Sequence, residues 1–354
     1  MVSIPKAIVE AYALDPDLQE EAVAHIPSLI NSTFRVESRL RGHSGPIILQ
    51  RLHPVFGANV HLDIEVVTAH LETQGVETPR LIRNRNAELW TVETSTEEPR
   101  IWRAQTFIDG LTIHRSSDPS TLASAAALLG SFHAALFDLR YEFVHVRPIH
   151  DTAKHLAKLL AALASERARG DAQVQALGAR VARHAETVRL DFSEFPRRIV
   201  HGDPKLSNLL FHRDQPNEAR CLIDLDALGY DYLAYELGDA LRSWCNSAGE
   251  DTPAVNVQPD LLAAVLSGYA RERPPGMARE EIFSALDGLE TVSLELASRF
   301  AADAIIDSYF GWDATRFPSR RAHNLVRAEG QLALSEHVRD QRAALEKVAL
   351  EALP

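Results

Sequence analysis

Polar residues crowd one short stretch of the chain, between two runs of residues that favour β-strands. In "VHGDPKLSNLLF", residues 200–211, Asp203, Lys205 and Asn208 stand at relative positions 0, +2 and +5. Downstream, the short apolar run of "CLIDLD" leads to Asp224. Phosphoryl transfer requires a carboxylate that aligns the attacking hydroxyl, an amide and a carboxylate that hold Mg²⁺, and a cation on the γ-phosphate. These residue types at this spacing therefore favour phosphoryl-transfer chemistry.

The spacing also suggests which residue has which role. We expect Asp203 to face the hydroxyl, Lys205 to face the phosphate, and Asn208 and Asp224 to hold the metal ion. A hairpin of "NLLFH" and "ARCLIDL" would bring Asn208 and Asp224 side by side, as a shared metal ion requires. Oxygen ligands without Cys or His suit Mg²⁺ better than zinc. The alternative is that Asp203 and Asn208 only cap turns, which the spacing of all four polar residues disfavours.

The composition indicates a folded protein that acts on small molecules. A chain of 354 residues with 45% apolar content is long enough for two lobes with cores of their own. The net charge of −12 disfavours nucleic acid and membranes as partners, because both bind clustered cations. Cys221 and Cys245 form neither a metal-binding spacing nor a disulfide framework. The N-terminus does not resemble a signal peptide and no stretch has membrane-span length, so we predict a cytoplasmic protein.

The first hundred residues have the pattern of an antiparallel sheet with one inserted helix. After a short helix over residues 5–13, "SLINSTFRVESRLRGHSGPIILQRL" predicts a hairpin. The next segment, "NVHLDIEVVTAHLETQG", predicts an amphipathic helix that ends at Gly75. The apolar residues at helical spacing in it are Leu62, Val66, Val67 and Leu71. The segments "PRLIRN", "ELWTVET" and "RIWRAQTFI" complete the predicted sheet.

The remainder of the chain has mainly helical patterns. We predict helices over residues 122–139, over 152–189 with an interruption at Gly170, and from 234 to 354. A β-patch over residues 198–226 interrupts them. The change of texture near residues 110–117 predicts two domains, a lobe of residues 1–112 and a lobe of residues 113–354.

The motifs resemble those of a known group of kinases. "HGDPKLSN" and "LIDLD" are similar to the catalytic and metal motifs of the aminoglycoside phosphotransferase and choline kinase families. Further segments resemble the N-acetylhexosamine kinase branch: "IILQRLHPVF", "WRAQTFIDG", "LIDLDALGYDYLAYELGDALR", "RFAADAIIDSYF" and "AHNLVRAEGQLAL". The resemblance implies an α+β, two-lobed protein-kinase-like fold whose N-terminal sheet binds nucleotide and whose larger, mainly helical lobe carries catalysis. It also implies ATP and Mg²⁺ as cofactors, and a sugar or N-acetylated amino sugar as acceptor.

The resemblance gives each motif residue of the C-terminal lobe a role. Asp203 matches the catalytic aspartate, and Asn208 and Asp224 match the metal ligands. Asp226, two residues along the strand, would share the face of Asp224, where a second metal contact and a solvated hydrogen-bonding role are equally open. His201 is expected to pack the loop. Glu236 and Asp239, near the start of the following helix, are expected to be structural supports, because carboxylates there favour the helix dipole and cap amides.

In the N-terminal lobe, the family expects a Lys or Arg on the third strand that contacts the α- and β-phosphates. Arg51 is our choice in "IILQRL", with Gln50 in its place if the register slips by one residue. Its acidic partner on the next helix would be Asp63 or Glu65, although a solvated helix face competes with this interpretation.

"QTFIDG" resembles the hinge, where backbone groups of Thr106 and Ile108 would read the adenine edge. The phosphate-covering loop would lie in "SLINSTFRV", residues 28–36, which contain no Gly. This departs from the family pattern, because glycine lets backbone amides approach phosphate closely.

The acceptor pocket is expected between the catalytic loop and the C-terminal helices. Arg299 and Asp303 are four residues apart on one helix face, and Tyr309 and Phe310 follow. Such groups hydrogen-bond and stack a sugar, although a helix-surface ion pair above core aromatics would look the same. A second helix face would line or support this pocket: His323, Asn324, Arg327 and Gln331.

Two alternatives stay open at this point. The acceptor could be choline, an aminoglycoside or another amine-bearing alcohol, since the net charge does not show where the acids lie. The chain could also be a non-catalytic nucleotide-binding member of the fold, although it keeps Asp203, Asn208 and Asp224. Protein-kinase activity is disfavoured, because no activation segment with an APE-like anchor follows the second motif.

Overall fold

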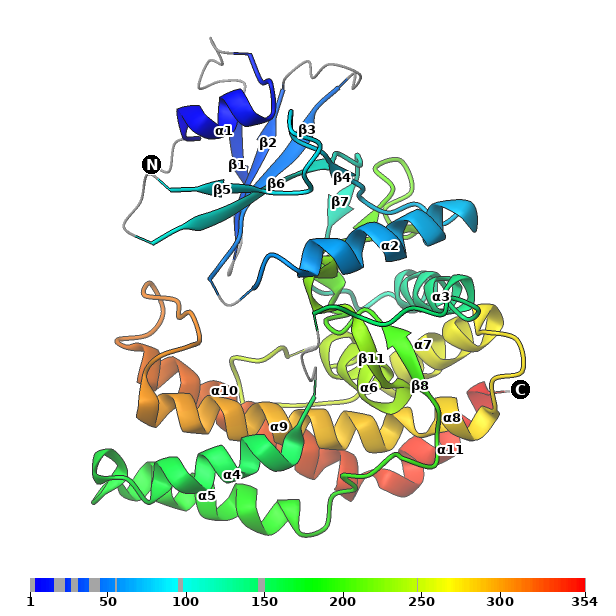
Figure 1. Ribbon diagram of the computed structural model, residues 1–354. Helices are drawn as coiled ribbons and strands as arrows, with labels where there is room; N and C mark the ends of the chain where they lie inside the picture. The colour runs from blue at the N-terminus through cyan, green and yellow to red at the C-terminus, as the bar shows by residue number, and fades with distance from the viewer. Residues whose placement is uncertain are drawn as a thin grey trace. The chain divides into compact units, whose positions relative to one another are not determined.

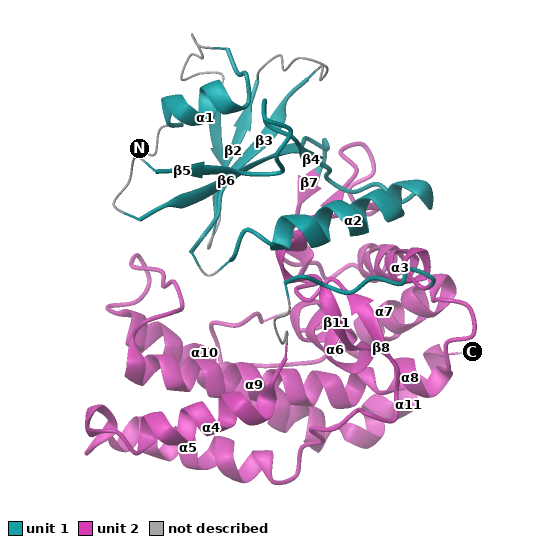
Figure 2. Ribbon diagram, in the orientation of Figure 1, with its two compact units in different colours: residues 1–110, 138–146 teal, residues 111–137, 147–354 magenta. Residues whose placement is uncertain are grey.

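The computed structural model describes residues 4–15, 23–26, 31–37, 45–54, 56–94, 98–145, 150–246 and 248–353. The chain divides into two units (Figure 2). Unit 1 contains residues 1–110 and 138–146, and unit 2 contains residues 111–137 and 147–354. Our sequence boundary at residue 112 did not anticipate that residues 138–146 return to unit 1. Part of the predicted phosphate-covering loop, residues 28–30, lies outside the described residues.

An antiparallel sheet forms most of unit 1 (Figure 1). Its strands are β1 (Val23–Ile26), β2 (Ser32–Val36), β3 (Ile47–Arg51), β4 (Leu81–Ile82), β5 (Thr91–Glu93) and β6 (Arg100–Thr106). The order is β1-β2-β3-β6-β4, and β5 also pairs with β6. Helix α2 (Val60–Thr73) follows β3. The predicted N-terminal sheet with an inserted helix is thus confirmed.

One face of this sheet is apolar because alternate residues of its strands point to it. Helix α1 (Lys6–Ala11) contributes to the core on this face. The buried core residues are Ile8, Tyr12, Leu14, Phe34, Val36, Ile47, Leu49, Trp102 and Ala104. Arg51 is paired with Trp102, so it continues the α1 face at the end of β3.

Helix α2 buries a different stripe from the one we predicted. Its core residues are Val60, Ile64, Val67 and Leu71. Leu62 and Val66 are instead 37% and 36% exposed, so their placement in the core was wrong. The helix carries more apolar residues than one face can bury, and sequence spacing did not distinguish the two sets. The predicted stop is present, because Gly75 follows α2 with a φ of +76°.

The carboxylate of Asp63 in α2 holds the segment 138–146 in unit 1. It accepts hydrogen bonds of 2.8 Å from the Tyr141 hydroxyl and from the backbone N–H groups of Val144 and His145. Burial, together with the hydrogen bond to this carboxylate, raises the pKa of Tyr141 to about 12. Asp63 is 1% exposed, so its carboxylate has almost no contact with water. The three hydrogen bonds replace those that water would otherwise make to it.

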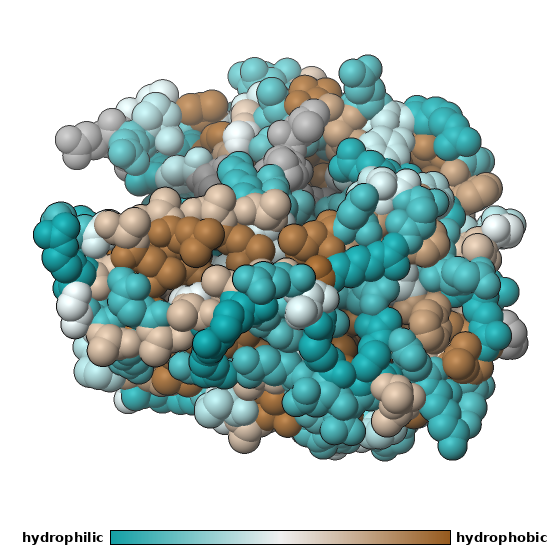
Figure 3. All heavy atoms as spheres, turned by 90° about the horizontal axis from the view of Figure 1, so that it is seen from below, coloured by the Kyte–Doolittle hydropathy of each residue, from teal (hydrophilic) through white to brown (hydrophobic). Residues whose placement is uncertain are grey.

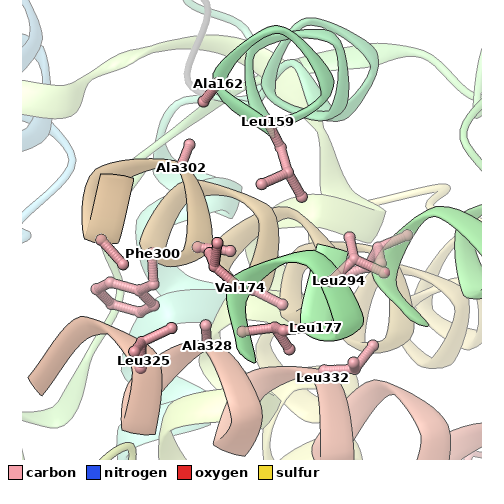
Figure 4. Close-up of a cluster of buried hydrophobic side chains, with 14 of the residues drawn as sticks. Leu159, Ala162, Val174, Leu177, Leu294, Phe300, Ala302, Leu325, Ala328 and Leu332 are labelled. Carbon is pink, nitrogen blue, oxygen red and sulfur yellow. The ribbon is translucent and has the colours of Figure 1, made fainter. Parts of the chain in front are cut away.

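Unit 2 is mainly helical, as predicted (Figure 1). Its helices are α3 (Pro119–Ala135), α4 (Thr152–Leu163), α5 (Ala172–Ala185), α6 (Leu233–Trp244), α7 (Pro259–Glu272), α8 (Arg279–Phe283), α9 (Ala285–Ile306), α10 (Arg320–Asp340) and α11 (Arg342–Ala352). Leucine, valine, alanine and phenylalanine side chains of α4, α5, α9 and α10 interlock in one core (Figure 4). The predicted break at Gly170, with a φ of +79°, separates α4 from α5.

Short strands inside unit 2 frame the predicted motifs. They are β7 (Leu111–Thr112), β8 (Arg197–Val200), β9 (Leu209–Phe211), β10 (Ala219–Leu222) and β11 (Gly229–Tyr232). β10, β9 and β7 form one antiparallel sheet, and β8 pairs with β11. The hairpin predicted from "NLLFH" and "ARCLIDL" is therefore confirmed.

Most of the face drawn in Figure 3 is hydrophilic; its largest group of apolar side chains lies left of centre, and smaller groups lie elsewhere on the face. Among the described residues, no helix is both long enough and apolar enough to cross a membrane. Cys221 and Cys245 are buried free cysteines.

Helices α6 and α9 cross at two glycines. A Cβ on Gly288 would lie 1.7 Å from the carbonyl oxygen of Ala234, and a Cβ on Gly238 would lie 2.3 Å from the Gly288 carbonyl carbon. The backbones can approach so closely only because neither residue has a side chain. This crossing fixes α6 on the helix that runs through the core of unit 2.

Replacing Gly288 by Ala should destabilise unit 2 by about 3 kcal/mol, because the added methyl group has no room to move away from Ala234. The measurement is the midpoint of thermal unfolding, followed by circular dichroism. Gly311→Ala is the control, since a Cβ there meets no atom within 4 Å. Equal midpoints for the two variants would contradict the close crossing.

Candidate active site

The HGD loop, residues 201–208, connects β8 to β9 in unit 2. Its ends are fixed because both strands are paired and the flanking residues Val200 and Leu209 are buried. Within the loop, the carbonyl oxygen of Pro204 accepts a hydrogen bond of 2.8 Å from the indole of Trp244 in α6. The 3₁₀ helix η3 (Leu206–Asn208) then closes the loop. The loop backbone is thus tied to two small sheets and to α6.

The carboxylate of Glu236, in the first turn of α6, holds the start of the HGD loop. It accepts hydrogen bonds from the backbone N–H groups of His201 (2.9 Å) and Gly202 (3.0 Å), and His133 of α3 lies 3.4 Å away. Burial favours the neutral acid, but the hydrogen bond and charge of His133 outweigh it and lower the pKa of Glu236. Glu236 is thus a structural support, as predicted, but the amides that it caps belong to the loop and not to the start of α6.

The loop start also depends on Gly202 and His201. Gly202 has a φ of +81°, and a Cβ there would lie 2.4 Å from the carbonyl oxygen of Ala227. The His201 ring accepts a hydrogen bond at Nδ1 from the Asp203 N–H (3.3 Å), so its Nε2–H donates to the Ile223 carbonyl (2.9 Å). These two bonds select one neutral tautomer of His201. His201 is buried, which confirms its predicted structural role.

Asp203 and Lys205 form an ion pair inside the loop. Lys205 Nζ lies 2.6 Å from Asp203 Oδ2, and the two side chains are 35% and 34% exposed. Burial raises the pKa of Asp203, but Lys205 and the hydrogen bond from Asn208 outweigh it and lower the pKa overall. The pKa of Lys205 is raised, because the charges of Asp203, Asp224 and Asp239 outweigh its burial. Both groups therefore keep their charges at neutral pH.

Asn208 and Asp224 present oxygen atoms suited to a magnesium ion. The Asn208 amide nitrogen donates to Asp203 O (2.8 Å) and Oδ2 (2.9 Å), which turns the amide oxygen away from Asp203. A bond of 2.9 Å from the Ile223 N–H to the Asn208 carbonyl places Asp224 next to this residue. Within the described ranges, no three His, Cys, Asp or Glu side chains group as a metal site. Two protein oxygens still fit Mg²⁺, which takes its other ligands from water and phosphate.

Our reason for placing Asp226 beside Asp224 is wrong. Strand β10 ends at Leu222, so strand alternation does not extend to either acid. Asp224 has a left-handed φ of +64° and is exposed, whereas Asp226 is 4% exposed within the 3₁₀ helix η4 (Leu225–Ala227). The role of Asp226 as a metal ligand stays a prediction.

A buried charge cluster that we did not predict lies near α6. The Glu295 carboxylate of α9 accepts hydrogen bonds from Asp151 N–H (3.1 Å) and the Thr152 hydroxyl (2.9 Å), and His150 lies 3.2 Å away. Burial opposes ionisation, yet the charge of His150 outweighs it and lowers the pKa of Glu295 to about 2. The partners are far apart in sequence, so no local pattern signalled this pair.

The predicted acceptor residues differ in their surroundings. The Asp303 carboxylate accepts hydrogen bonds from the N–H groups of Ser308 (3.0 Å), Tyr309 (2.9 Å) and Phe310 (3.0 Å). Asp303 is therefore engaged by the chain itself and places the loop after α9. Arg299 lies over the Phe310 ring, 5.6 Å from its centroid, while Tyr309 is 44% exposed.

The predicted face of α10 buttresses that same loop. His323 stacks on Phe317 at 3.9 Å and lies 2.8 Å from a carboxylate oxygen of Asp251. Arg327 donates to the carbonyl oxygen of Gly311 at 2.9 Å. Asn324 donates to Asp303 at 2.9 Å. The Asp251 partner was missed, because it lies far from α10 in the sequence.

The nucleotide residues predicted in unit 1 have well-defined surroundings. Arg51 donates to the Ser32 hydroxyl at 3.2 Å on the α1 face. Neither predicted acidic partner contacts it, because Asp63 holds residues 141–145 and Glu65 pairs with Arg83 at 2.8 Å. The Thr106 N–H donates to the Arg80 carbonyl oxygen at 2.9 Å. Arg51, Thr106 and Ile108 stay predictions as nucleotide contacts.

Comparison with known families and structures gives consistent matches. The model of a family described as "Phosphotransferase enzyme family" matches residues 25–281. A microcompartment-associated aminopropanol kinase is 14% identical, with a TM-score of 0.66, over 97% of this chain and 98% of that one. An amicoumacin kinase in complex with AMP-PNP, Ca²⁺ and Ami is 13% identical, with a TM-score of 0.64, over 93% of this chain and 91% of that one.

A choline/ethanolamine kinase family protein from Mesorhizobium loti is 15% identical, with a TM-score of 0.54, over 94% of this chain and 92% of that one. At such identities these likenesses show a shared fold. The predicted protein-kinase-like fold is thereby confirmed.

Replacing Glu236 by Gln should destabilise the protein by about 3 kcal/mol near neutral pH. The neutral Gln side chain cannot attract His133 as a carboxylate does, and its NH₂ group would point at a loop N–H that needs an acceptor. The folded-state pKa of Glu236 is lowered, so its contribution is present above the ordinary carboxyl pKa and is lost as pH falls through the folded value. Urea unfolding of wild type and variant between pH 7 and pH 3.5 measures the gap between their free energies of unfolding, which should narrow as the pH falls. Glu280→Gln, at an exposed position, is the control, and a gap independent of pH would contradict the prediction.

Proposed function

The chain belongs to the phosphotransferase enzyme family, and from this premise we propose that it transfers the γ-phosphoryl group of ATP to a hydroxyl of a small molecule. The observation that carries the proposal is the HGD loop: Glu236 holds its backbone, and Asp203 is paired with Lys205 and Asn208 at its centre. Asp224 follows on the neighbouring strand connection. Aligned attack and charge stabilisation are the main requirements of this reaction.

Asp203 would accept a hydrogen bond from the acceptor hydroxyl and align it with the γ-phosphorus. Its lowered pKa keeps the carboxylate ionised at neutral pH, so it can accept this bond throughout the physiological range. Lys205, whose pKa is raised, would carry its charge to the transferring phosphoryl group.

Asn208 Oδ1 and the Asp224 carboxylate would hold Mg²⁺, and Asp226 is a further candidate ligand. The ion, when bound, neutralises phosphate charge. On the nucleotide, backbone groups of Thr106 and Ile108 would read the adenine edge. Arg51 was our predicted phosphate contact.

For the acceptor, we propose a sugar or an N-acetylated amino sugar. Tyr309 and Trp312 are 44% and 37% exposed in the loop after α9, and such rings can stack on a sugar face. Arg299 could hydrogen-bond the sugar hydroxyls, while Asp303 would act by placing the loop. The sequence segments that resemble N-acetylhexosamine kinases support the same acceptor.

An amine-bearing alcohol is the second candidate, and buried acids favour it. The charges of Glu295, Asp239 and Asp231 all act on His150, so these acids lie close together in unit 2. Asp239 and Asp224 also act on Lys205 beside Asp203. A cationic acceptor would be attracted to this region. The aminopropanol kinase among the similar structures bears a name that agrees with such a substrate.

The test is ATP consumption with Mg²⁺ against free sugars, N-acetylated hexosamines, choline, aminopropanol and aminoglycosides. Asp203→Ala should lower kcat by about 10²- to 10⁴-fold on the active acceptor, with ATP binding retained, because this carboxylate acts on the acceptor side. Asp214→Ala, at an exposed position of the β9–β10 connection, is the matched control. Normal turnover in Asp203→Ala would contradict the role of Asp203. Intact ATP binding without turnover on any acceptor would favour the non-catalytic alternative.

Removing a predicted metal ligand should weaken nucleotide binding only when Mg²⁺ is present. We expect Asn208→Ala and Asp224→Ala to lower the ATP affinity by roughly tenfold in Mg²⁺, since each removes one charged or polar oxygen ligand. Isothermal titration calorimetry with Mg²⁺ and with EDTA measures the difference. Asn217→Ala, in the exposed connection between β9 and β10, is the control. The same Mg²⁺ dependence in all variants would place the metal elsewhere.

A further inference from the structure

Three polar side chains lie side by side on the face of the unit 1 sheet opposite α1. Thr33 of β2 is paired in register with Gln50 of β3, and Gln50 is paired with Arg103 of β6. Gln50 Nε2 donates to Thr33 Oγ1 at 3.0 Å, and Arg103 Nε donates to Gln50 Oε1 at 2.8 Å. We call these three residues the polar row.

The polar row is unusual for the centre of a sheet. Thr33 is 8% exposed and Arg103 is 1% exposed, so the row crosses three adjacent strands and is buried at both ends, with Gln50 half-buried between them. Stability alone would favour apolar side chains there, as on the α1 face, because burying polar groups and charges costs free energy. A buried polar row across the sheet therefore indicates a polar ligand or a polar partner on this face.

Strand alternation excludes a cation from β3 on this face. Ile47, Leu49 and Arg51 point to the α1 face, and Ile48 and Gln50 point to the opposite one. Two arginines stand on the polar-row face, Arg35 of β2 and Arg103 of β6, and Arg103 is the one paired in register with Gln50. The bond from Arg103 Nε to Gln50 fixes the plane of a guanidinium, whose forked donors match phosphate oxygens.

Arg103 also stands at a suitable place along the chain. Three residues after Arg103, β6 ends at Thr106, where the predicted adenine-reading segment begins. Three strand residues span roughly 10 Å, which is comparable to the length of a nucleoside. A nucleotide whose base meets this segment can therefore extend its phosphates toward the level of Arg103.

We propose that Arg103 on β6 contacts the phosphates of ATP in place of a cation on β3, with Gln50 as its positioning residue. This proposal rests on the proposed kinase function. Gln50 would hold the guanidinium plane through its carbonyl oxygen, and Thr33 would hold Gln50. Arg51, on the α1 face, would have no part in nucleotide binding.

Calorimetric titration of the full chain with ATP in Mg²⁺, and separately with adenosine, tests the proposal. The variants are Arg103→Gln, Arg103→Lys, Arg51→Gln as the rival phosphate contact, and Arg100→Gln, at the start of β6, as the matched control. Arg103→Gln should weaken ATP binding by about 10- to 100-fold, the loss of a charge-assisted contact, and should leave adenosine binding unchanged. Arg103→Lys should lose less, because it keeps the charge without the fork. Arg51→Gln should lose less ATP affinity than Arg103→Gln, and Arg100→Gln should bind ATP as wild type does.

Each other result has a definite meaning. Unchanged ATP affinity in Arg103→Gln, or a larger loss in Arg51→Gln, would overturn the proposal and leave the kinase function standing. Equal losses for ATP and adenosine would show that Arg103 only supports the fold, and would also overturn it. If Arg103→Gln does not fold, the Arg103→Lys variant takes its place. Equal losses of ATP and adenosine affinity in a folded Arg103→Lys variant would also overturn the proposal. A wild-type chain that binds no ATP would overturn the proposed function itself.

Discussion

The site depends on one buried carboxylate that takes the place of water for two backbone amides. Glu236 accepts hydrogen bonds from the His201 and Gly202 N–H groups where the chain turns away from β8. A loop that is held by its backbone leaves its side chains available for chemistry. His133 on α3 lies 3.4 Å from this carboxylate, so the geometry of the loop depends on how α3 and α6 pack.

Charge balance explains why the centre of the HGD loop can stay ionised without a ligand. Asp203 and Lys205 neutralise each other, and the Asn208 amide donates to the same carboxylate oxygen, Oδ2 of Asp203. The same bonds leave the amide oxygen of Asn208 pointing away from Asp203. One short segment thus combines a carboxylate, an ammonium and an amide oxygen, which in the proposed function would face the acceptor hydroxyl, the phosphate and the metal ion.

Sequence reasoning succeeded where neighbouring residues determine the structure. The HGD loop, the hairpin after it and the break at Gly170 follow from local spacing and turn chemistry. It failed where partners are distant: nothing near Asp63 indicated residues 141–145, and nothing near Glu295 indicated His150. Sequence reasoning also could not determine which face of a strand or helix a residue occupies. Which side Arg51 occupies depends on strand register, and which stripe of α2 is buried depends on what packs against it.

The tether at Asp63 has a consequence for how this protein can be divided. The chain passes from one unit to the other after residues 110, 137 and 146, so no single cut separates the units. A fragment that ended at residue 110 would lack the three donors that satisfy the Asp63 carboxylate. Asp63, which is buried in the whole chain, would then be exposed to water. Unit 1 is therefore a compact body in space without being a continuous stretch of sequence, and a gene fusion or truncation has to carry residues 138–146 with it.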